Sequence, residues 1–314
     1  MSAGAPPDRS GGPPDRAGGP PDRAGGPPDR RVALVTGCGK PDGSGQAIAR
    51  ALAADGAAVV AADRRPTGVP NRRQEVVSTA HPASWHGLDT LVSEIEAAGG
   101  TAVSVLGDIG DEHDAQAMVG TALAQFGRLD ILVNNAAAPQ GLDRNVPDEI
   151  PIEVFDDVIR INLRGTWLMC REAVPAMRRQ RWGRIINVSS MAGVIGAPRS
   201  TPYSASKAGI IGLTRALAMD VAAFGVTVNV ICPGALDTSR SVLSLDPDLD
   251  VRAEMEQRGR RLPVGRVGRP DDVAAAVRYL AGDGAAFMTG QMLVLDGGGP
   301  APFPLPRPEE ESGP

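Results

Sequence analysis

The chain has 314 residues, of which 42% are hydrophobic and 22% charged, and its formal net charge at pH 7 is −5. An acidic chain without a basic stripe does not suit nucleic acid, so we expect no nucleic-acid partner. No apolar run is long enough to span a membrane, and the start lacks the apolar core of a signal peptide, so we expect no membrane segment.

The number and spacing of cysteines and histidines indicate the redox state of the compartment and whether a metal site is expected. The three cysteines are dispersed and odd in number, which does not suggest a disulfide framework. The three histidines show no metal-ligand spacing with a cysteine or carboxylate cluster. We therefore expect a reduced, cytoplasmic protein without a metal site.

Both ends of the chain differ from its middle. From Pro6 to Arg30 the unit Pro-Pro-Asp-Arg recurs every seven residues between glycine pairs, and such a segment has no apolar face to bury. The residues from Ala301 onward are rich in proline and include three consecutive glutamates. We predict a disordered leader over residues 1–30, one domain over 31–299 and a tail over 300–314.

Within the domain, short apolar runs alternate with helical patterns. Strands are expected over residues 32–35, 57–62, 101–106, 129–133, 184–188, 226–231 and 292–295. Helices are expected over residues 46–54, 88–98, 115–126, 152–180, 203–224 and 271–280, the fourth being broken near Gly165. Continuous apolar strands separated by helices predict an α/β fold, a doubly wound parallel sheet that binds ligands at the carboxyl ends of its strands.

The stretch 64–87 has no clear period. It holds three prolines, charged pairs and Trp85. Loops of this length in compact domains are usually functional or disordered. We predict an ordered or semi-ordered insertion beside the nucleotide end of the sheet.

A glycine-rich turn, Thr36 to Gly45, joins the first strand to the first helix. Glycines let the backbone approach a pyrophosphate, and the N-terminus of the helix offers free N–H groups. The turn therefore predicts a nucleotide site formed by Gly37, Gly43, Ser44 and Gly45.

Asp63 closes the second strand, where the adenosine ribose of a dinucleotide would lie. A carboxylate there can accept both ribose hydroxyls of NAD and would repel the 2′-phosphate of NADP. Arg64 and Arg65 follow, and with Lys40 they could bind that phosphate instead. We expect NAD, with NADP less favoured, because the arginines can turn to solvent.

Tyr203 and Lys207 lie four residues apart, so in a helix the phenol and the ammonium share one face. The unperturbed pKa of a phenol is about 10, and a neighbouring positive charge lowers it. Such a pair can pass a proton to or from an alcohol or carbonyl oxygen. A serine pair, Ser189 and Ser190, precedes it.

The order of these motifs resembles the short-chain dehydrogenase/reductase family over roughly Arg31 to Gly299. The landmarks in this sequence are Thr36-Gly37 with Gly43 and Gly45, Asp63, Asp108-Ile109, Asn134-Asn135-Ala136, Asn162, Ser190, Tyr203, Lys207, Pro233-Gly234, Thr238 and Asp296-Gly297-Gly298. The resemblance implies a single Rossmann-type domain with a parallel sheet of about seven strands.

The resemblance also implies four catalytic residues. Tyr203 would be the acid/base, and Lys207 would lower its pKa and hold the nicotinamide ribose. Ser190 rather than Ser189 would hydrogen-bond the substrate oxygen. Asn162 would anchor a water that relays protons to Lys207.

The remaining family positions imply cofactor contacts. Asp108 would meet the adenine ring, Asn135 the adjoining ribose region and Thr238 the nicotinamide carboxamide. The further cofactor-binding positions are Gly37, Gly43, Ser44, Gly45, Asp63, Ile109, Ala136, Tyr203, Lys207, Pro233 and Gly234. The alternative for these residues is a purely structural role as helix caps or turn residues.

Three features depart from the family pattern. The glycine-rich turn is two residues longer than usual, and Ala137 stands where glycine is common. The insertion 64–87 resembles the enlarged region of a subgroup that retains its nicotinamide and uses an external redox partner. These departures concern the pyrophosphate contacts and the exchange of cofactor, not the four catalytic positions.

These features predict an oxidoreductase that transfers a hydride reversibly between NAD(H) and a small-molecule secondary alcohol or ketone. The alternatives are an NADPH-dependent 3-oxoacyl thioester reductase and a non-catalytic nicotinamide-binding protein. The family implies a homo-oligomer, a tetramer or a dimer, formed through the helices within 165–180 and 203–224.

The substrate cover is expected over residues 235–263, with flanks over residues 138–144 and 193–201. Its apolar residues suit a hydrophobic ketone or secondary alcohol. Arg240, Arg252 and Arg258 could bind an anionic group such as a carrier-bound acyl chain, although a solvated helix face is the favoured interpretation.

Overall fold

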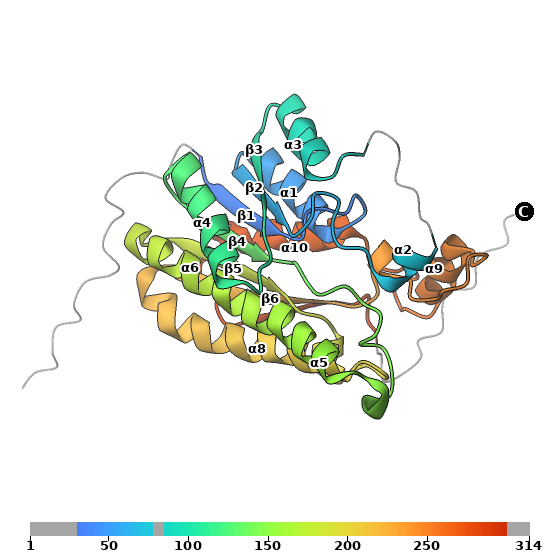
Figure 1. The fold of residues 1–314 in the computed structure, drawn as a ribbon. Coiled ribbons are helices and arrows are strands. Elements are labelled where there is room, and N and C mark those ends of the chain that lie inside the picture. The colour runs from blue at the N-terminus through green and yellow to red at the C-terminus, as the bar shows by residue number, and fades with distance from the viewer. Residues whose placement is uncertain (1–29, 78–84, 300–314) are drawn as a thin grey trace, which may run out of the picture.

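The computed structural model describes residues 30–77 and 85–299. Its centre is a sheet of seven strands in the order β3-β2-β1-β4-β5-β6-β7 (Figure 1). Every neighbouring pair is parallel. The strands are β1 (Val32–Thr36), β2 (Ala58–Asp63), β3 (Thr101–Leu106), β4 (Ile131–Asn134), β5 (Gly183–Val188), β6 (Val226–Pro233) and β7 (Met292–Leu295). The predicted doubly wound α/β sheet is confirmed, and its strand order reverses between β1 and β4.

Helices cover both faces of the sheet. In Figure 1, α1 (Ser44–Ala54), α3 (Leu88–Ala97) and α10 (Pro270–Ala281) lie on one side, and α4 (Glu112–Phe126), α6 (Gly165–Gln180) and α8 (Thr201–Val221) on the other. The sequence did not indicate two short helices, α2 (Arg72–Val76) and α7 (Ala192–Ile195), and it indicated α9 (Val251–Arg260) only as the solvated helix face favoured for Arg252 and Arg258. Their brief or polar patterns bury little apolar surface.

Strand β1 shows how the two layers arise. All five of its residues are buried. Successive side chains of a strand point to opposite faces. Ala33 and Val35 accordingly join the core under α1 and α10, whereas Val32 and Leu34 join the core under α4, α6 and α8. A strand buried on both faces must be continuously apolar, which is why these runs could be recognised in the sequence.

The long helical stretch that begins with α5 (Ile152–Ile159) is interrupted by η2 (Arg160–Arg164), a π-helical turn. The interruption ends immediately before Gly165, close to the predicted break. π-Helical turns occur frequently at functional sites. Here the turn contains Asn162, one of the predicted catalytic residues.

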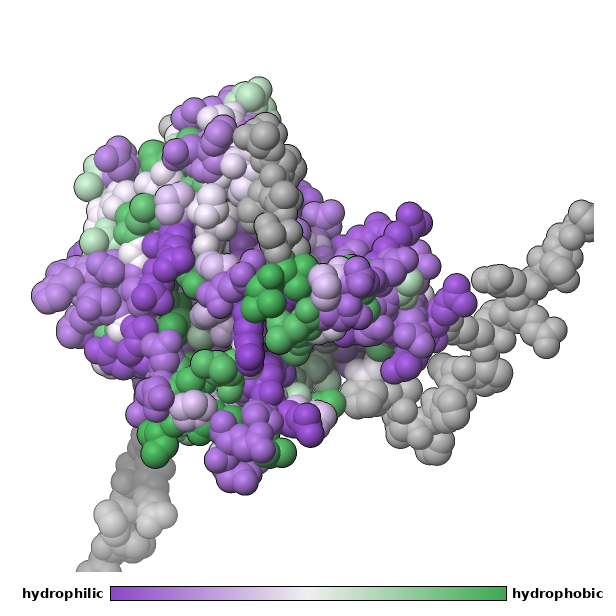
Figure 2. All heavy atoms as spheres, turned by 45° about the vertical axis from the view of Figure 1, so that its right-hand side comes forward, coloured by the Kyte–Doolittle hydropathy of each residue, from purple (hydrophilic) through white to green (hydrophobic). Residues whose placement is uncertain are grey.

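The surface in Figure 2 is hydrophilic over most of the projection formed by α2 and α9, with apolar side chains gathered in separate small groups elsewhere. Among the described helices, none combines the length and the hydrophobicity needed to cross a membrane. The predicted leader up to Asp29 and the tail from Pro300 lie outside the described residues.

Candidate active site

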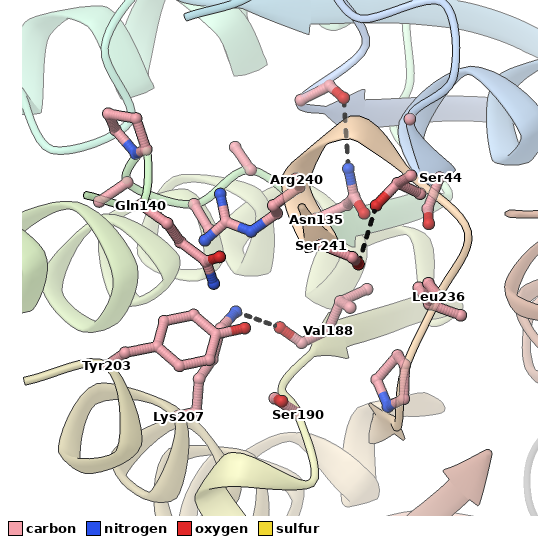
Figure 3. A pocket seen from close by; sticks show the side chains of 18 of the residues that line it. Ser44, Asn135, Gln140, Val188, Ser190, Tyr203, Lys207, Leu236, Arg240 and Ser241 are labelled. Atoms are coloured by element: carbon pink, nitrogen blue, oxygen red, sulfur yellow. Dashed lines mark hydrogen bonds between the residues drawn. The ribbon is translucent and has the colours of Figure 1, made fainter. Parts of the chain in front are cut away.

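A cavity of about 590 Å³ opens at the carboxyl ends of the strands. The last residues of β1, β2, β5 and β6 are on its wall, as is Asn135 directly after β4. This is the edge at which doubly wound sheets bind ligands. Its other walls are the start of α8, the glycine-rich turn and a loop after β6 that contains η4 (Ser239–Ser241) (Figure 3).

Tyr203 and Lys207 project from the first turns of α8 into this cavity. The Lys207 side chain is 3% exposed, and its Nζ donates a 2.7 Å hydrogen bond to the carbonyl oxygen of Val188 at the end of β5 (Figure 3). The ammonium lies 5.7 Å from the centroid of the Tyr203 ring. Helix and sheet together therefore hold a cation next to the phenol.

The surroundings of Tyr203 favour ionisation of its phenol. Burial alone would raise the pKa, but the positive charges of Lys207 and Arg240 outweigh it, helped by a hydrogen bond with Ser190 and by Arg144. The pKa of Tyr203 therefore lies below its ordinary value. Burial lowers the pKa of Lys207 in turn. Such a phenol can exchange a proton nearer to neutral pH than a free tyrosine can.

The two serines before the tyrosine have different roles. The Ser189 hydroxyl is buried and donates a 2.7 Å hydrogen bond to the carbonyl of Lys207, which ties β5 to α8. The Ser190 hydroxyl accepts a 3.1 Å hydrogen bond from the N–H of Ala192 and lies on the cavity wall. Ser190 has one hydroxyl proton, which it can donate either to the Tyr203 phenolate or to a ligand.

Asn162 is fully buried behind the cavity. Its Oδ1 accepts a 2.8 Å hydrogen bond from the N–H of Ala138, and its Nδ2 donates at 2.9 Å to the hydroxyl of Ser206. Ser206 donates in turn to the carbonyl of Tyr203 at 2.8 Å. The Asn162 side chain thus connects the loop after β4 with the helix that carries Tyr203.

The glycine-rich turn is closely packed at two of its glycines. A Cβ on Gly45 would lie 2.1 Å from the carbonyl oxygen of Gly37, and Gly37 itself has a positive φ of 78°. Asn135 donates through Nδ2 to the carbonyls of Thr36 and Gly37 at 3.0 and 3.3 Å. Its side chain therefore stabilises the turn, while the N–H groups of Asn135 and Ala136 both donate to the Thr36 hydroxyl.

Helix α1 begins beside the cavity. Its cap residue is Gly43, which has no side chain to cap the first N–H groups, and both Gly43 and Ser44 line the cavity. Uncapped N–H groups and the positive end of the helix dipole suit an anionic pyrophosphate. The residues present therefore fit a dinucleotide.

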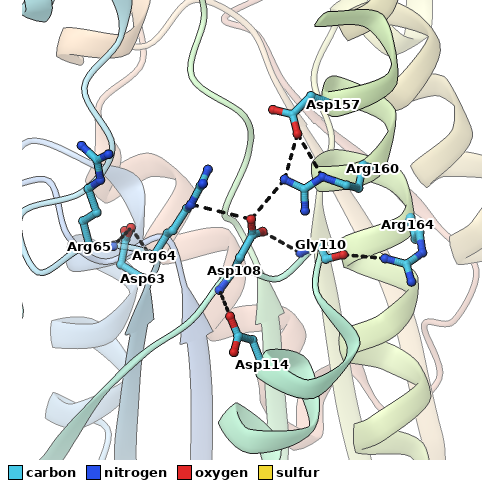
Figure 4. A network of polar contacts seen from close by, with 9 residues as sticks. All are labelled: Asp63, Arg64, Arg65, Asp108, Gly110, Asp114, Asp157, Arg160 and Arg164. Atoms are coloured by element: carbon cyan, nitrogen blue, oxygen red, sulfur yellow. Dashed lines mark hydrogen bonds and ion pairs between the residues drawn. The ribbon is translucent and has the colours of Figure 1, made fainter. Parts of the chain in front are cut away.

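Asp63 lies at the carboxyl end of β2, on the cavity wall. Its carboxylate accepts hydrogen bonds from the N–H groups of Gly39 at 2.8 Å and Arg64 at 2.7 Å, with a longer bond from Arg65 (Figure 4). Burial raises the pKa of Asp63 despite these bonds. The carboxylate is thereby held in place at the end of the cavity predicted for the adenosine ribose.

Asp108 is the centre of a polar network at the same end (Figure 4). Its carboxylate accepts from the N–H of Gly110 at 2.8 Å and from Arg160 at 3.1 Å, and it lies 3.6 Å from Nε of Arg64. Burial opposes its ionisation, but Arg160 and Gly110 hold the pKa of Asp108 below its usual range. The Arg64 side chain is 49% exposed, in keeping with the expectation that it can turn to solvent, and it also pairs with this carboxylate.

Most of the remaining predicted cofactor positions lie at the end of the cavity away from Asp108. The exception is Ile109, which directly follows Asp108. Pro233, Gly234 and Thr238 all line it, and the Thr238 hydroxyl lies 3.3 Å from that of Ser241. Ile109 also lines the cavity and is 6% exposed, since most of its side chain joins the core.

The lengthened glycine-rich turn contacts the substrate cover, residues 235–263, through Asp42. The Asp42 carboxylate accepts hydrogen bonds from both the N–H and the hydroxyl of Ser239 in η4. Helix α2 of the insertion reaches the same residue, because Asn71 donates to the Ser239 carbonyl at 3.0 Å. Lys40 completes the connection by donating to Gln74 at 2.6 Å. The lengthened turn and the insertion together therefore hold the loop after β6 over the cavity.

Helix α2 had a signal that was overlooked. Asn71 accepts from the N–H of Gln74, whose side chain accepts from the N–H of Asn71, a reciprocal capping box. The pattern Asn-x-x-Gln at a helix start resembles the known capping-box signature. Arg144 lies at the end of the predicted flank 138–144 and lines the cavity, but the sequence assigned it no role of its own.

The three arginines considered for the cover differ in position. Arg252 on α9 is a solvated residue, 91% exposed and paired with Glu256. Arg258 lines the cavity but pairs with Glu254. The solvated-face interpretation is wrong for Arg240, which belongs to η4 and lies beside Tyr203 (Figure 3).

Comparison with known proteins agrees with this geometry. A family model described as enoyl-(acyl carrier protein) reductase matches residues 75–299. A 3-oxoacyl-[acyl-carrier-protein] reductase of Synechocystis sp. is 38% identical over 85% of this chain and 96% of its own. The cis-4-hydroxycyclohexanecarboxylate dehydrogenase of Sinomonas cyclohexanicum is also 38% identical, over 85% of this chain and 96% of its own.

Among solved structures, a variant of actinorhodin polyketide ketoreductase with NADPH superposes with a TM-score of 0.73 and 33% identity. It covers 86% of this chain and 97% of its own. With this fold, this cavity and these relatives, the chain belongs to the short-chain dehydrogenase/reductase family of nicotinamide-dependent oxidoreductases that act on CH–OH groups.

Proposed function

We propose that this protein transfers a hydride reversibly between NAD(H) and a secondary alcohol or ketone, with Tyr203 as the acid/base. The observation that carries the proposal is the half-buried Tyr203 beside the buried Lys207, a pair that faces a cavity also lined by Ser190. When bound, the nicotinamide supplies hydride chemistry at its C4. The protein supplies position and charge.

In the oxidation direction, the Tyr203 phenolate takes the hydroxyl proton of the alcohol. Ser190 donates a hydrogen bond to the same oxygen and orients it. Lys207 stabilises the phenolate and, on the cofactor side, is the residue proposed to hold the nicotinamide ribose. In reduction, Tyr203 returns the proton to the forming alkoxide.

Asn162 is proposed to position other groups of the site rather than to contact the substrate. Its side chain holds the loop at Ala138 and, through Ser206, the first turn of α8. A proton-relay water anchored at this π-helical turn remains part of the proposal.

We propose NAD rather than NADP. Asp63 places a carboxylate at the predicted ribose, and two of the three cations that could bind a 2′-phosphate contact other side chains, whereas Arg65 is exposed. Arg64 pairs with Asp108, and Lys40 donates to Gln74, while burial and the charge of Arg240 lower the pKa of Lys40 to about 8. The alternative is a 3-oxoacyl thioester reductase that uses NADPH, which the names of the Synechocystis relative and of the NADPH-containing ketoreductase structure favour.

We further propose that cofactor exchange is slow. Ser239 donates hydrogen bonds to Asp42 and accepts them from Asn71 and Gln74, and these bonds hold the loop after β6 over the cavity. Cofactor bound beneath it could leave only after these bonds break. Purified protein is therefore expected to contain nicotinamide after gel filtration, and cofactor-free protein would contradict slow exchange.

A cytoplasmic homo-oligomer, a tetramer or a dimer, remains a proposal. Trp167 on α6 and Met219 on α8 are 47% and 71% exposed and suit an apolar contact between copies. Leu168, Ile210 and Ile211 of the same two helices are core residues and are not available for such a contact. Light scattering after gel filtration measures the assembly directly.

The test of the proposed function is NAD- and NADP-linked turnover on a panel of secondary alcohols, ketones and 3-oxoacyl thioesters. NAD-linked oxidation or reduction of a simple alcohol or ketone supports the proposal. Turnover confined to thioesters with NADPH would establish the alternative. Cofactor-bound protein that is inert with every substrate, also with an artificial electron acceptor, would favour a non-catalytic nicotinamide-binding protein.

A further inference from the structure

Two arginines share the substrate end of the cavity with Tyr203. Arg144 belongs to the loop after β4 and Arg240 to η4, and both line the cavity. Their guanidinium carbons lie 4.9 and 5.7 Å from the centroid of the Tyr203 ring. Figure 3 shows the Arg240 guanidinium beside this ring, near Gln140. With Lys207, three cations surround one phenol.

The protein leaves these guanidinium groups incompletely paired. Nη2 of Arg240 and Nε of Arg144 are buried and have no hydrogen-bond partner. Within residues 30–77 and 85–299, no carboxylate pairs with Arg240, and Arg144 has only Asp143, with 3.7 Å between Nε and Oδ2. Buried charged donors without partners are costly. A ligand that accepted their hydrogen bonds would remove that cost.

Gln140 holds the pair together. In the amide orientation that satisfies both groups, its oxygen accepts from Arg144 and its nitrogen donates to the carbonyl of Arg240 at 3.0 Å. Burial lowers the pKa of the Arg144 guanidinium. A fixed, partly desolvated pair of guanidinium groups is suited to binding a planar anion.

We propose that the substrate carries an anionic group, in the simplest case a carboxylate, that accepts hydrogen bonds from Arg144 and Arg240 while its reacting oxygen meets Tyr203 and Ser190. This inference rests on the proposed alcohol and ketone oxidoreductase activity. A neutral ketone would leave both orphan donors unpaired. The pyrophosphate of the cofactor is a second possible anion, but the uncapped start of α1 at Gly43 provides a separate site for it.

The test compares keto acids with their neutral methyl esters, using 4-oxopentanoate, 5-oxohexanoate and longer members of the series. The readout is the ratio of kcat/KM for acid to kcat/KM for ester. This ratio cancels any effect of a substitution on Tyr203 itself or on folding. We expect the ratio to favour the acid in the native protein and to fall about tenfold to a hundredfold in Arg144→Gln and in Arg240→Gln.

Arg252→Gln is the matched control, because it removes the same charge from an exposed site on α9. Its ratio is expected to stay within about twofold of the native value. A native ratio near one, or one that neither cavity variant changes, would overturn the inference. So would a rise in KM for NAD with an unchanged ratio, since the arginines would then bind the cofactor phosphates.

If no ketone of either kind is reduced, the proposed function fails separately, and binding still tests the anion site. The chain has only two tyrosines, so phenolate absorbance can be titrated with Tyr203→Phe as the reference. A carboxylate next to Arg240 would offset its charge and raise the pKa of Tyr203. We expect this rise with saturating keto acid but not with ester, and its absence would overturn the inference.

Discussion

The floor and the roof of the cavity are built differently. The floor consists of β5 and α8, whose residues Ser189, Ser206 and Lys207 are buried and hydrogen-bonded to the backbone. The roof consists of the insertion at α2 and the loop with η4, connected mainly by side-chain hydrogen bonds to Ser239. The fold itself therefore fixes the proton chemistry, whereas a few polar contacts position the groups that choose substrate and cofactor.

This difference separates the expected effects of substitution. A change in the floor should reduce kcat, because it alters the groups at the reacting oxygen. A change in the roof should alter affinity, specificity or cofactor exchange and leave the proton transfer in place.

The largest effect is expected for Tyr203→Phe, which removes the acid/base and keeps the ring. General acid–base catalysis contributes about 10²–10⁴-fold, so kcat should fall by that factor with thermal stability little changed. Tyr279→Phe is the control, since Tyr279 is the only other tyrosine and is 52% exposed on α10. Equal activity of the two variants would remove Tyr203 from the chemistry.

Asn162→Ala tests whether the floor depends on its buried support. The substitution leaves the N–H of Ala138 without its partner and the Ser206 hydroxyl with only its bond to the Tyr203 carbonyl. An unsatisfied buried N–H costs about 1–3 kcal/mol, so the free energy of unfolding should fall and kcat with it. Urea unfolding measures the free energy of unfolding, and steady-state turnover measures kcat. Asn145→Ala, which removes only a bond to the adjacent Val146 N–H, should change neither by a comparable amount.

Asp63→Asn examines cofactor choice in the outer part of the cavity. The amide keeps an oxygen that can accept from backbone N–H groups but loses the negative charge that would repel a 2′-phosphate. We expect the ratio of kcat/KM for NAD to that for NADP to fall by about tenfold, that is, by about 1.4 kcal/mol. An unchanged ratio would show that this carboxylate does not decide the cofactor.

The pH dependence of alcohol oxidation depends on both the floor and the roof, because Tyr203 lies on α8 and Arg240 in η4. Only the phenolate of Tyr203 accepts a proton, so the rate should rise with pH through a midpoint below 10 and then level off, because cations lower the pKa of Tyr203. Arg240→Gln removes one of these charges and should move the midpoint upward. A downward movement, or none, would mean that Arg240 does not act on the phenol.

The smallest effect on turnover is expected for Arg73→Gln in the roof. Arg73 is 6% exposed and donates to the carbonyls of Ser244 and Asp246, which joins α2 to the cover. Its loss should raise the release rate of bound nicotinamide several-fold while kcat stays within about twofold. Arg72→Gln, an exposed neighbour, is the control. Release measured by fluorescence should be unchanged in that variant.

Sequence reasoning recovered the floor far better than the roof. Apolar strands and the spacing of Tyr203 and Lys207 follow periodic rules, so all seven strands were expected within a few residues of their observed bounds. Helix α2 and the position of Arg240 depend on single polar contacts between distant segments, which have no period. Arg144 was expected only as part of the flank 138–144, because only the folded chain brings it to the ring of Tyr203.

The most direct test of the central claim follows a deuterium atom from the carbinol carbon of a secondary alcohol. Under single-turnover conditions, the native protein should transfer that deuterium to C4 of its nicotinamide without loss to solvent, and Tyr203→Phe with cofactor bound should transfer it at least about a hundredfold more slowly. Mass spectrometry of the released nicotinamide reads the result. Deuterium found in water, or transferred equally fast without the phenol, would contradict direct hydride transfer assisted by Tyr203.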